Sequence, residues 1–334
     1  MLEKNNLNEG VATEVNFTNQ PKYSEHEVDN DFNERREALL PLIKEFISTH
    51  PLFLNKKVDV TFMHSGVSCL VCRIDAPENK IILKIPLSII NPRLEGKFLK
   101  AWEDVGVKVP HVFEEGPIGN HFYILMEYID AKTLNEVSTH EELLEKDIYR
   151  ELGAIMRKMH QVKSYGYGEA VNTEDKPKYK NAEEWLNNDE RLKGILKYTT
   201  DHNLLDDEKH GSLEYSINII KTKTLPKNET VYCHNDFGKN NILATNPPTI
   251  FDPWPSFNHP YMDIARMIAV AGSESVEREF TAGYFDGEFC DRQLLQAFVV
   301  LNVAIKIPYA HKQNALGRIE KMHKYLENTK KYLD

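Results

Sequence analysis

Residues 231–252 constrain the fold of this chain more than any other segment, because short apolar runs alternate there with polar residues in a fixed order. Apolar residues at Val231–Cys233 and at Ile242–Leu243 predict two short strands on either side of the loop HNDFGKNN at 234–241. After a turn, a third short apolar run leads directly to Asp252. The pattern therefore predicts strands that present a polar loop and deliver one aspartate.

The loop carries a histidine, an aspartate and an asparagine at a spacing that is used in phosphoryl transfer. His234, Asp236 and Asn241 match the pattern H-x-D-x-x-x-x-N, in which the aspartate orients the attacking hydroxyl and the asparagine holds a magnesium ion. An isolated match occurs readily by chance, and a lone histidine is more often structural. Asp252, which follows the next strands, is a second candidate metal ligand. A chance match is less probable when the loop and this aspartate occur together in the expected order.

The same loop permits a different assignment, because Asp236-Phe237-Gly238 spells the DFG motif that binds metal in protein kinases. In that case a second H-x-D…N loop should lie a little upstream. The stretch 205–230 is polar and helix-compatible and contains no such loop. We therefore predict that Asp236 is the catalytic base and that Asp252 is the metal ligand.

Length and composition favour a soluble protein of two domains or lobes. The chain has 334 residues, of which 41% are hydrophobic and 28% are charged, as in ordinary globular proteins. No apolar run approaches the ~18 residues that a membrane span needs, and the amino-terminal segment has no apolar signal core. We therefore expect a cytoplasmic protein without a membrane partner.

The net charge argues against a nucleic-acid-binding protein, and the cysteine positions argue against a zinc or redox site. The net charge of −10 argues against a nucleic-acid partner and is compatible with a cationic substrate. The cysteines at 69, 72, 233 and 290 lie in or beside apolar segments, which suits reduced thiols. The pair Cys69-x-x-Cys72 has no second pair or suitably spaced histidine, and on a strand its side chains face opposite sides, so we expect no zinc or redox site.

Three parts are predicted along the chain. Residues 1–30 form a polar segment without sustained periodicity, residues 31–130 form an N-terminal lobe with nucleotide-binding strands, and residues 131–334 form a helical C-terminal lobe with the catalytic loop and the substrate site. In the first lobe, alternating apolar residues predict a hairpin within 58–74 and a third strand at 81–85. The expected fold class is α+β, with a small antiparallel β lobe before the larger helical lobe.

Lys84 and Glu95 are the candidates for the phosphate-binding pair of such an enzyme. Lys84 lies on the third predicted strand between apolar residues, about ten residues before a predicted helix with Glu95 in its first turn. Phosphoryl transfer uses a lysine on the phosphates and an acidic residue that holds this lysine. The alternative is an edge-strand lysine that protects the sheet against aggregation.

The ordered combination resembles the aminoglycoside phosphotransferase and choline kinase superfamily of small-molecule kinases. The resemblance covers roughly residues 58–310 and rests mainly on the runs HNDFGKNNIL, IFDP and HPYMDIARMI. It implies a bilobal protein-kinase-like fold with Asp236 as catalytic base and with Asn241 and Asp252 as magnesium ligands. It also implies that Asp263 is a structural aspartate that steadies the loop.

Two departures from the family pattern lie at the site. The usual family loop is closer to H-G-D-x-x-x-x-N, and Asn235 replaces the glycine here. We expect this replacement to leave the base and metal-binding roles intact and to change the backbone conformation of the loop. Asp252 is followed by Pro-Trp-Pro, so we expect a different local path and a different substrate entrance.

Backbone groups supply the remaining nucleotide contacts that we expect. The turn at 65–68 is a candidate for wrapping phosphate oxygens with N–H groups and the Ser68 hydroxyl, although alone it is more simply a hairpin turn. The segment 126–129, with Glu127 and Ile129, is expected to bind the adenine edge through its backbone. The sequence contains no G-x-G-x-x-G or G-x-x-x-x-G-K-[ST] loop. Recognition of the base by backbone groups depends on their conformation, so both ATP and GTP are candidate phosphoryl donors.

The acceptor is expected on the larger lobe, in 163–230 and in the helices after 260. Acidic residues there could bind amines, as an aminoglycoside requires, although most should form solvated helix faces. They are Glu183, Glu184, Asp189, Glu190, Asp206, Asp207, Glu274, Glu277, Asp286 and Glu288. The leading hypothesis is an O-phosphotransferase of an aminoglycoside-type antibiotic, which confers resistance. The alternatives are a metabolic kinase for choline, a sugar or an amino-acid alcohol, and a nucleotide-binding pseudokinase with a regulatory role.

Overall fold

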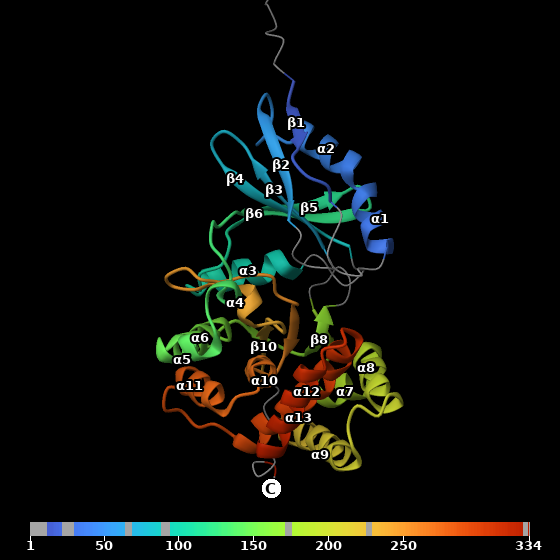
Figure 1. Cartoon of the computed structure of the whole chain (residues 1–334), viewed down its shortest axis with the longest axis vertical. Helices are drawn as coiled ribbons and strands as arrows, with labels where there is room; N and C mark the ends of the chain where they lie inside the picture. The colour runs from blue at the N-terminus through green and yellow to red at the C-terminus, as the bar shows by residue number, and fades with distance from the viewer. Residues whose placement is uncertain are drawn as a thin grey trace, which may run out of the picture. The chain divides into compact units, whose positions relative to one another are not determined.

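The computed structural model describes residues 12–21, 30–63, 69–87, 94–170, 176–224, 229–329 and 333. The chain forms two compact units. Figure 1 colours the chain by residue number, from blue at the N-terminus to red at the C-terminus. Unit 1 comprises Met1–Gly96 and Pro110–Asp130, and unit 2 comprises Lys97–Val109 and Ala131–Asp334. Each unit contributes a separate set of candidate site residues.

Unit 1 contains a six-stranded sheet with the order β1-β2-β3-β4-β6-β5. Its strands are β1 (Glu14–Phe17), β2 (Lys57–Met63), β3 (Cys69–Asp75), β4 (Lys80–Pro86), β5 (Val112–Ile118) and β6 (His121–Glu127). Neighbouring strands from β2 onward are antiparallel, whereas β1 pairs with β2 in parallel. The predicted antiparallel strands are present, and β1 is an additional edge strand in a segment whose polar composition gave no strand signal.

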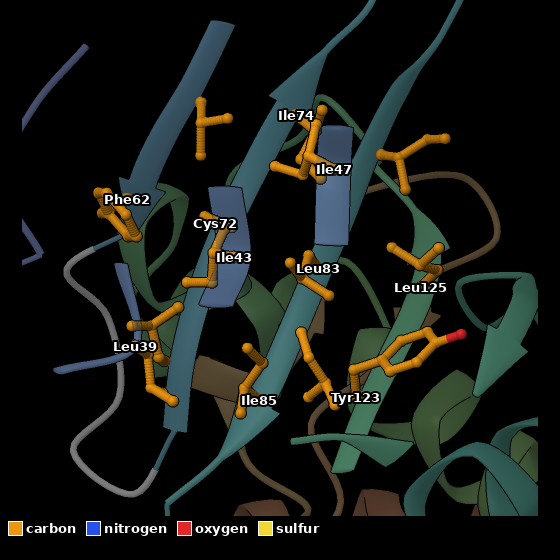
Figure 2. Close-up of a cluster of buried hydrophobic side chains, with 14 of the residues drawn as sticks. Leu39, Ile43, Ile47, Phe62, Cys72, Ile74, Leu83, Ile85, Tyr123 and Leu125 are labelled. Atoms are coloured by element: carbon orange, nitrogen blue, oxygen red, sulfur yellow. The ribbon is translucent and has the colours of Figure 1, made fainter. Parts of the chain in front are cut away.

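The core of unit 1 lies between α2 and one face of this sheet. Helices α1 (Asn30–Ala38) and α2 (Leu40–Thr49) precede β2, and Pro41 occupies the first turn of α2, where its missing N–H costs nothing. Figure 2 shows Ile43 and Ile47 of α2 beside Cys72 and Leu83 of the sheet. Because side chains alternate along a strand, every second residue of β3 and β4 enters this core.

The opposite face of β4 carries Lys84, which is nevertheless buried. Leu83 and Ile85 on either side of it belong to the core, so Lys84 points to the other face. Helix α3 (Leu94–Asp104) begins with Glu95 in its first turn, where an acidic residue complements the helix dipole. A buried lysine requires a partner of opposite charge, and Glu95 supplies it.

Unit 2 is mainly helical and includes two small sheets. Its helices are α4 (Leu134–Val137), α5 (His140–Glu145), α6 (Ile148–Met159), α7 (Ala182–Asn188), α8 (Glu190–Asp201), α9 (Asp207–Thr224), α10 (Tyr261–Ala271), α11 (Glu274–Phe285), α12 (Arg292–Lys312) and α13 (Leu316–Thr329). One sheet has the order β7-β10-β13-β8-β9, and the other pairs β11 with β12. The strands are β7 (Lys163–Ser164), β8 (Tyr167–Ala170), β9 (Pro177–Tyr179), β10 (Thr230–Cys233), β11 (Ile242–Leu243), β12 (Thr249–Ile250) and β13 (Ser256–Asn258).

Helix α12 is the only helix among the described residues that is long and apolar enough to cross a membrane. Polar residues at Gln296, Asn302 and Lys306 interrupt its apolar sequence, so it contains no continuous apolar run of this length. In the structure 78% of the apolar window is buried inside the protein, and α12 packs against α9, α10 and α13. Burial of this extent is typical of a core helix, so the length and composition of α12 are only weak evidence for a membrane span.

Candidate active site

The loop between β10 and β11 is held in place by the carboxylate of Asp263. Asp263 lies in the first turn of α10 and is fully buried. Its Oδ2 accepts a hydrogen bond from the backbone N–H of His234 at 2.7 Å, and its Oδ1 accepts one from Asn235 N–H at 2.6 Å. Two consecutive loop amides are thereby satisfied by one side chain, which fixes the entry into the loop.

A buried cluster of His160, Cys233 and Asp263 brings three potential metal-binding atoms within 4.8 Å of one another. Each of these groups already has a protein partner. His160 Nε2 lies 3.2 Å from Asp263 Oδ2, His160 Nδ1 lies 2.8 Å from the Tyr284 hydroxyl, and Cys233 Sγ donates to the Asn258 carbonyl. Burial raises the pKa of the Cys233 thiol, which disfavours the thiolate that binds metal. The cluster therefore supports the loop.

His234 links the loop to the segment after β12. Its Nε2 donates to the Phe251 carbonyl at 3.0 Å, and its Nδ1 accepts the Asp236 N–H at 3.3 Å. These partners specify one neutral tautomer, and burial of the ring lowers the pKa of His234 accordingly. The Trp254 N–H adds a bond to the His234 carbonyl at 2.8 Å. His234 is thus a positioning residue in the observed structure.

Asn235 and Asp252 both adopt the left-handed backbone conformation, each with a φ of 53°. Glycine is the usual residue in this region, and asparagine and aspartate tolerate it better than other residues. This explains how Asn235 can occupy the family's glycine position. Its side-chain amide also donates to the Trp254 carbonyl at 3.2 Å and contacts the Ser256 hydroxyl, so the asparagine adds contacts that glycine lacks.

The carboxylate of Asp236 is surrounded by three nitrogen donors. Its Oδ1 lies 3.3 Å from Arg266 Nη2 and 3.2 Å from Lys306 Nζ, and its Oδ2 accepts from Asn241 Nδ2 at 2.8 Å. Burial alone would raise the pKa of Asp236, but the charges of Lys306 and Arg266 outweigh it and hold this pKa at about 2. Asp236 is therefore ionised at neutral pH.

Asn241 and Asp252 lie on segments joined by a backbone hydrogen bond, and both side chains carry oxygen atoms. The Phe251 N–H donates to the Asn241 carbonyl at 3.1 Å, which places Asp252 one residue from this contact. Because Asn241 Nδ2 donates to both the backbone and the side chain of Asp236, its Oδ1 is left as an acceptor. An amide oxygen and a carboxylate are hard donors that suit Mg²⁺.

Unit 1 supplies the second set of candidates. Lys84 Nζ lies 2.7 Å from Glu95 Oε1 and 2.6 Å from Oε2, and both side chains are buried. The Glu127 N–H already donates to the His111 carbonyl at 2.8 Å. The N–H of Ile129 makes no backbone hydrogen bond to a described residue. Ser68 and its turn lie outside the described residues.

A cavity of about 260 Å³ within unit 2 reaches the catalytic loop. Asp236 and Asn235 line it on the loop side, and Trp254 lines it from the Pro-Trp-Pro segment. Side chains of β8, α7, α8, α10 and α12 complete the wall. The cavity therefore combines residues from 163–230 with residues of the helices after 260, around the carboxylate that is the predicted base.

Most of the acidic residues considered for amine binding lie elsewhere. Only Asp189 of that set lines the cavity, and its Oδ1 caps α8 by accepting the Leu192 N–H at 2.9 Å. Others are paired with neighbouring cations: Glu190 with Lys193, Asp206 with Lys209, Glu277 with Arg292 and Asp286 with Arg157. These carboxylates act mainly in caps and ion pairs.

Residues 59–298 match the model of the phosphotransferase enzyme family known as APH, so the match spans more than two thirds of the chain. The chain belongs to this family. The relationship predicted from HNDFGKNNIL and IFDP is thereby confirmed, and this phosphotransferase is a small-molecule kinase with a hydroxyl acceptor. No curated relative matches its sequence.

Solved structures share the fold of this phosphotransferase over most of their length. A thermostable mutant of aminoglycoside phosphotransferase APH(4)-Ia, in a ternary complex with AMP-PNP and hygromycin B, is 14% identical with a TM-score of 0.60, covering 86% of this chain and 97% of that one. A proposed fructosamine-3-kinase from Thermobifida fusca is 15% identical with a TM-score of 0.57, covering 81% and 95%. A proposed aminoglycoside phosphotransferase from Ralstonia eutropha is 12% identical with a TM-score of 0.60, covering 88% and 97%. These likenesses confirm the predicted fold class.

Two contacts of the predicted base were missed in the sequence. Arg266 lies three residues after Asp263 on α10, and this spacing places both side chains on the helix face toward the loop. Lys306 is the only charged residue in the apolar run 293–308. A lysine in a buried helix requires a partner, so this exception to the apolar pattern was a usable signal.

Proposed function

We propose that this protein transfers the γ-phosphoryl group of ATP, or of GTP, to a hydroxyl group of a small molecule bound in the unit 2 cavity. The observation that carries the proposal is the arrangement around Asp236. An ionised carboxylate lines the cavity, and Asn241, which binds it, accepts a backbone hydrogen bond from Phe251, the residue before Asp252. A base candidate therefore lines a space that can hold an acceptor, and the two metal-ligand candidates lie on segments that are hydrogen-bonded to its loop.

In the proposed reaction the acceptor oxygen forms a bond to the γ-phosphorus while the bond from this phosphorus to the β,γ-bridging oxygen breaks. The nucleoside diphosphate leaves with that electron pair. Asp236 orients the acceptor hydroxyl and takes its proton as the oxygen becomes bonded to phosphorus. A carboxylate with a pKa of about 2 is a weak base, so its main contribution is orientation before the proton is transferred late in the step.

Asn241 and Asp252 would hold magnesium through their side-chain oxygens. Magnesium held there would supply positive charge to the phosphates. The role of Asn241 Nδ2 is independent of the metal, because it fixes the Asp236 carboxylate. Lys84, held by Glu95, is proposed to bind the donor phosphates, and the backbone near Ile129 is proposed to bind the adenine edge.

The chemical class of the acceptor is a separate prediction. An aminoglycoside-type antibiotic is the acceptor predicted from the sequence, and the solved structures of this fold include an aminoglycoside phosphotransferase bound to hygromycin B as well as a proposed fructosamine-3-kinase. These ligands belong to those proteins. The antibiotic acceptor, the cytoplasmic location and the absence of a nucleic-acid or membrane partner stay predictions.

The proposed function is tested by an ATP-consumption screen that covers aminoglycosides, choline, sugars, amino-acid alcohols and hydroxy acids, together with resistance testing of bacteria that express the protein. We expect acceptor-dependent formation of ADP with at least one class, and a rate at least about 10²-fold lower with the variant Asp236→Asn. Nucleotide binding without transfer to any acceptor would favour the pseudokinase alternative. Transfer to other alcohols without resistance would reject the antibiotic hypothesis alone.

The pair Lys84–Glu95 allows stability and catalysis to be separated. Lys84→Met leaves the buried Glu95 carboxylate without its lysine, so we expect a loss of about 3 kcal/mol in the free energy of unfolding. The double variant Lys84→Met/Glu95→Leu removes both charges and should recover most of this loss, as measured by urea unfolding. Phosphoryl transfer should stay about 10²-fold below wild type in both variants, because no lysine reaches the phosphates. Full activity in the double variant would reject this role for Lys84.

A further inference from the structure

Positive charge exceeds negative charge where the cavity meets the predicted base. Lys306 and Arg266 both line the cavity, and both contact the same oxygen of Asp236. One carboxylate thus faces two cations. Arg266 is 9% exposed, and its Nε is a buried nitrogen without a hydrogen-bond partner among the described residues. Cationic hydrogen-bonding capacity therefore remains beside the reacting position.

The carboxylates of the cavity wall do not balance this excess. Glu169 Oε1 accepts from Arg191 at 2.9 Å and from the Trp254 indole at 3.3 Å. Arg191 in turn stacks over the Trp254 ring, with its guanidinium carbon 4.3 Å from the ring centre. Asp189 caps α8. Both wall carboxylates thus have structural partners, whereas the recognition of a polycation requires several carboxylates directed at its amines.

We propose that the acceptor carries an anionic group, a carboxylate or a phosphate, close to the hydroxyl that receives the phosphoryl group, and that Lys306 and Arg266 bind this anionic group. The proposal rests on the proposed function and narrows its acceptor class. A volume of about 260 Å³ lies below the usual range for drug-sized ligands, so a small acceptor fits best. Such an acceptor replaces the polycationic antibiotic as the favoured class.

A different role for the two cations predicts a different result. If Lys306 and Arg266 only stabilise Asp236 or the transferring phosphoryl group, their charges act on every acceptor equally. Removal of Lys306 would then lower kcat for all acceptors by the same factor. If Lys306 binds an anionic group of the acceptor, its removal lowers kcat/KM selectively for anionic acceptors. The ratio between matched acceptors therefore distinguishes the two roles.

The experiment measures kcat/KM for pairs of alcohols that differ only in charge. One series pairs hydroxy acids with their amides, and a second pairs sugar phosphates with the parent sugars. Charge-assisted hydrogen bonds contribute about 1.5–3 kcal/mol, so the wild type should favour the anionic member of at least one series by 10–100-fold. Which series shows the preference identifies the anionic group as carboxylate or phosphate.

In Lys306→Met the preference should fall to nearly one, whereas the charge-retaining Lys306→Arg should keep most of it. Lys312→Met is the matched control, because Lys312 lies on the same helix, is exposed and does not line the cavity. Melting temperatures of all variants show whether they fold. A wild type that transfers phosphoryl groups without preferring anionic acceptors, or a preference that survives in Lys306→Met, overturns the proposal. Transfer to no acceptor in either series or in the wider screen overturns the proposed function as well.

The pH dependence of KM gives a second readout of the same contact. Burial and the neighbouring Arg266 lower the pKa of Lys306 to about 7, against the opposing effect of Asp236. The other groups near it are Tyr309, whose ring lies 5.7 Å from Lys306 Nζ, and Arg318, which adds repulsion. Lys306 is charged below this pKa, so KM for an anionic acceptor should rise as the pH increases above about 7. KM for the uncharged acceptor of the pair should not rise over this pH range. A parallel rise in KM for both acceptors would contradict the proposed contact between Lys306 and the anionic group.

Discussion

Asp236→Asn is expected to reduce kcat for phosphoryl transfer by about 10²–10⁴-fold, the usual contribution of a positioned acid–base group. The substitution keeps the shape of the side chain but removes its charge and its ability to take the proton. Nucleotide affinity should change little, because Asp236 is proposed to act on the acceptor. Steady-state ADP formation and direct titration with a nucleotide measure the two quantities separately.

Asp286→Asn is the matched control for this prediction. Asp286 pairs with Arg157 at 3.0 Å, is 68% exposed and adopts a left-handed conformation that asparagine tolerates. We expect wild-type turnover from it. Removal of the Asp236 charge also leaves Lys306 and Arg266 without their anion, so the melting temperature of Asp236→Asn must be measured. A folded Asp236→Asn variant with near-normal turnover would show that another group acts as the base.

Asp263→Ala is expected to destabilise the protein by about 3 kcal/mol or more. The substitution removes the acceptor for the N–H groups of His234 and Asn235, and a buried donor left without a partner costs about 1–3 kcal/mol. It also leaves His160 Nε2 without the carboxylate at 3.2 Å. Urea unfolding of unit 2, followed by the fluorescence of Trp102, Trp185 and Trp254, which all lie in this unit, measures the loss.

The matched control is Asp207→Ala, because Asp207 also lies in the first turn of a helix but is exposed. Its loss should cost no more than about 1 kcal/mol, the contribution of an acidic residue to the helix dipole. Activity should fall in Asp263→Ala even under conditions where the variant is folded, because the loop that carries Asp236 is no longer fixed. Equal stability of the two variants would contradict the supporting role of Asp263.

Local patterns were sufficient for much of the fold and for the order of the site residues. Alternating apolar residues in β3 and β4 predicted strands, and the spacing of His234, Asp236 and Asn241 predicted a loop of defined chemistry. Such signals depend on residues that are close in sequence, where strand and helix periodicities apply directly. The edge strand β1 escaped prediction, because its polar–apolar alternation covers only four residues and its pairing with β2 exists only in the folded unit.

Long-range contacts account for what the patterns missed. Arg266 and Lys306 reach Asp236 from positions 30 and 70 residues further along the chain. Several acidic residues that composition alone would offer to an amine are instead engaged in caps or ion pairs. A sequence lists the charged groups but does not specify which of them share a cavity, because that depends on how α8, α10 and α12 pack.

The sequence by itself determined that the loop HNDFGKNN and Asp252 belong to a phosphotransferase of this family, since residue type and spacing carry the chemistry of the loop. Only the tertiary structure decided the electrostatic setting of Asp236. There, burial strengthens the electrostatic interactions between nearby charges, and two cations from separate helices contact one carboxylate. That convergence shifts the expected acceptor from a polycation to a small anionic alcohol.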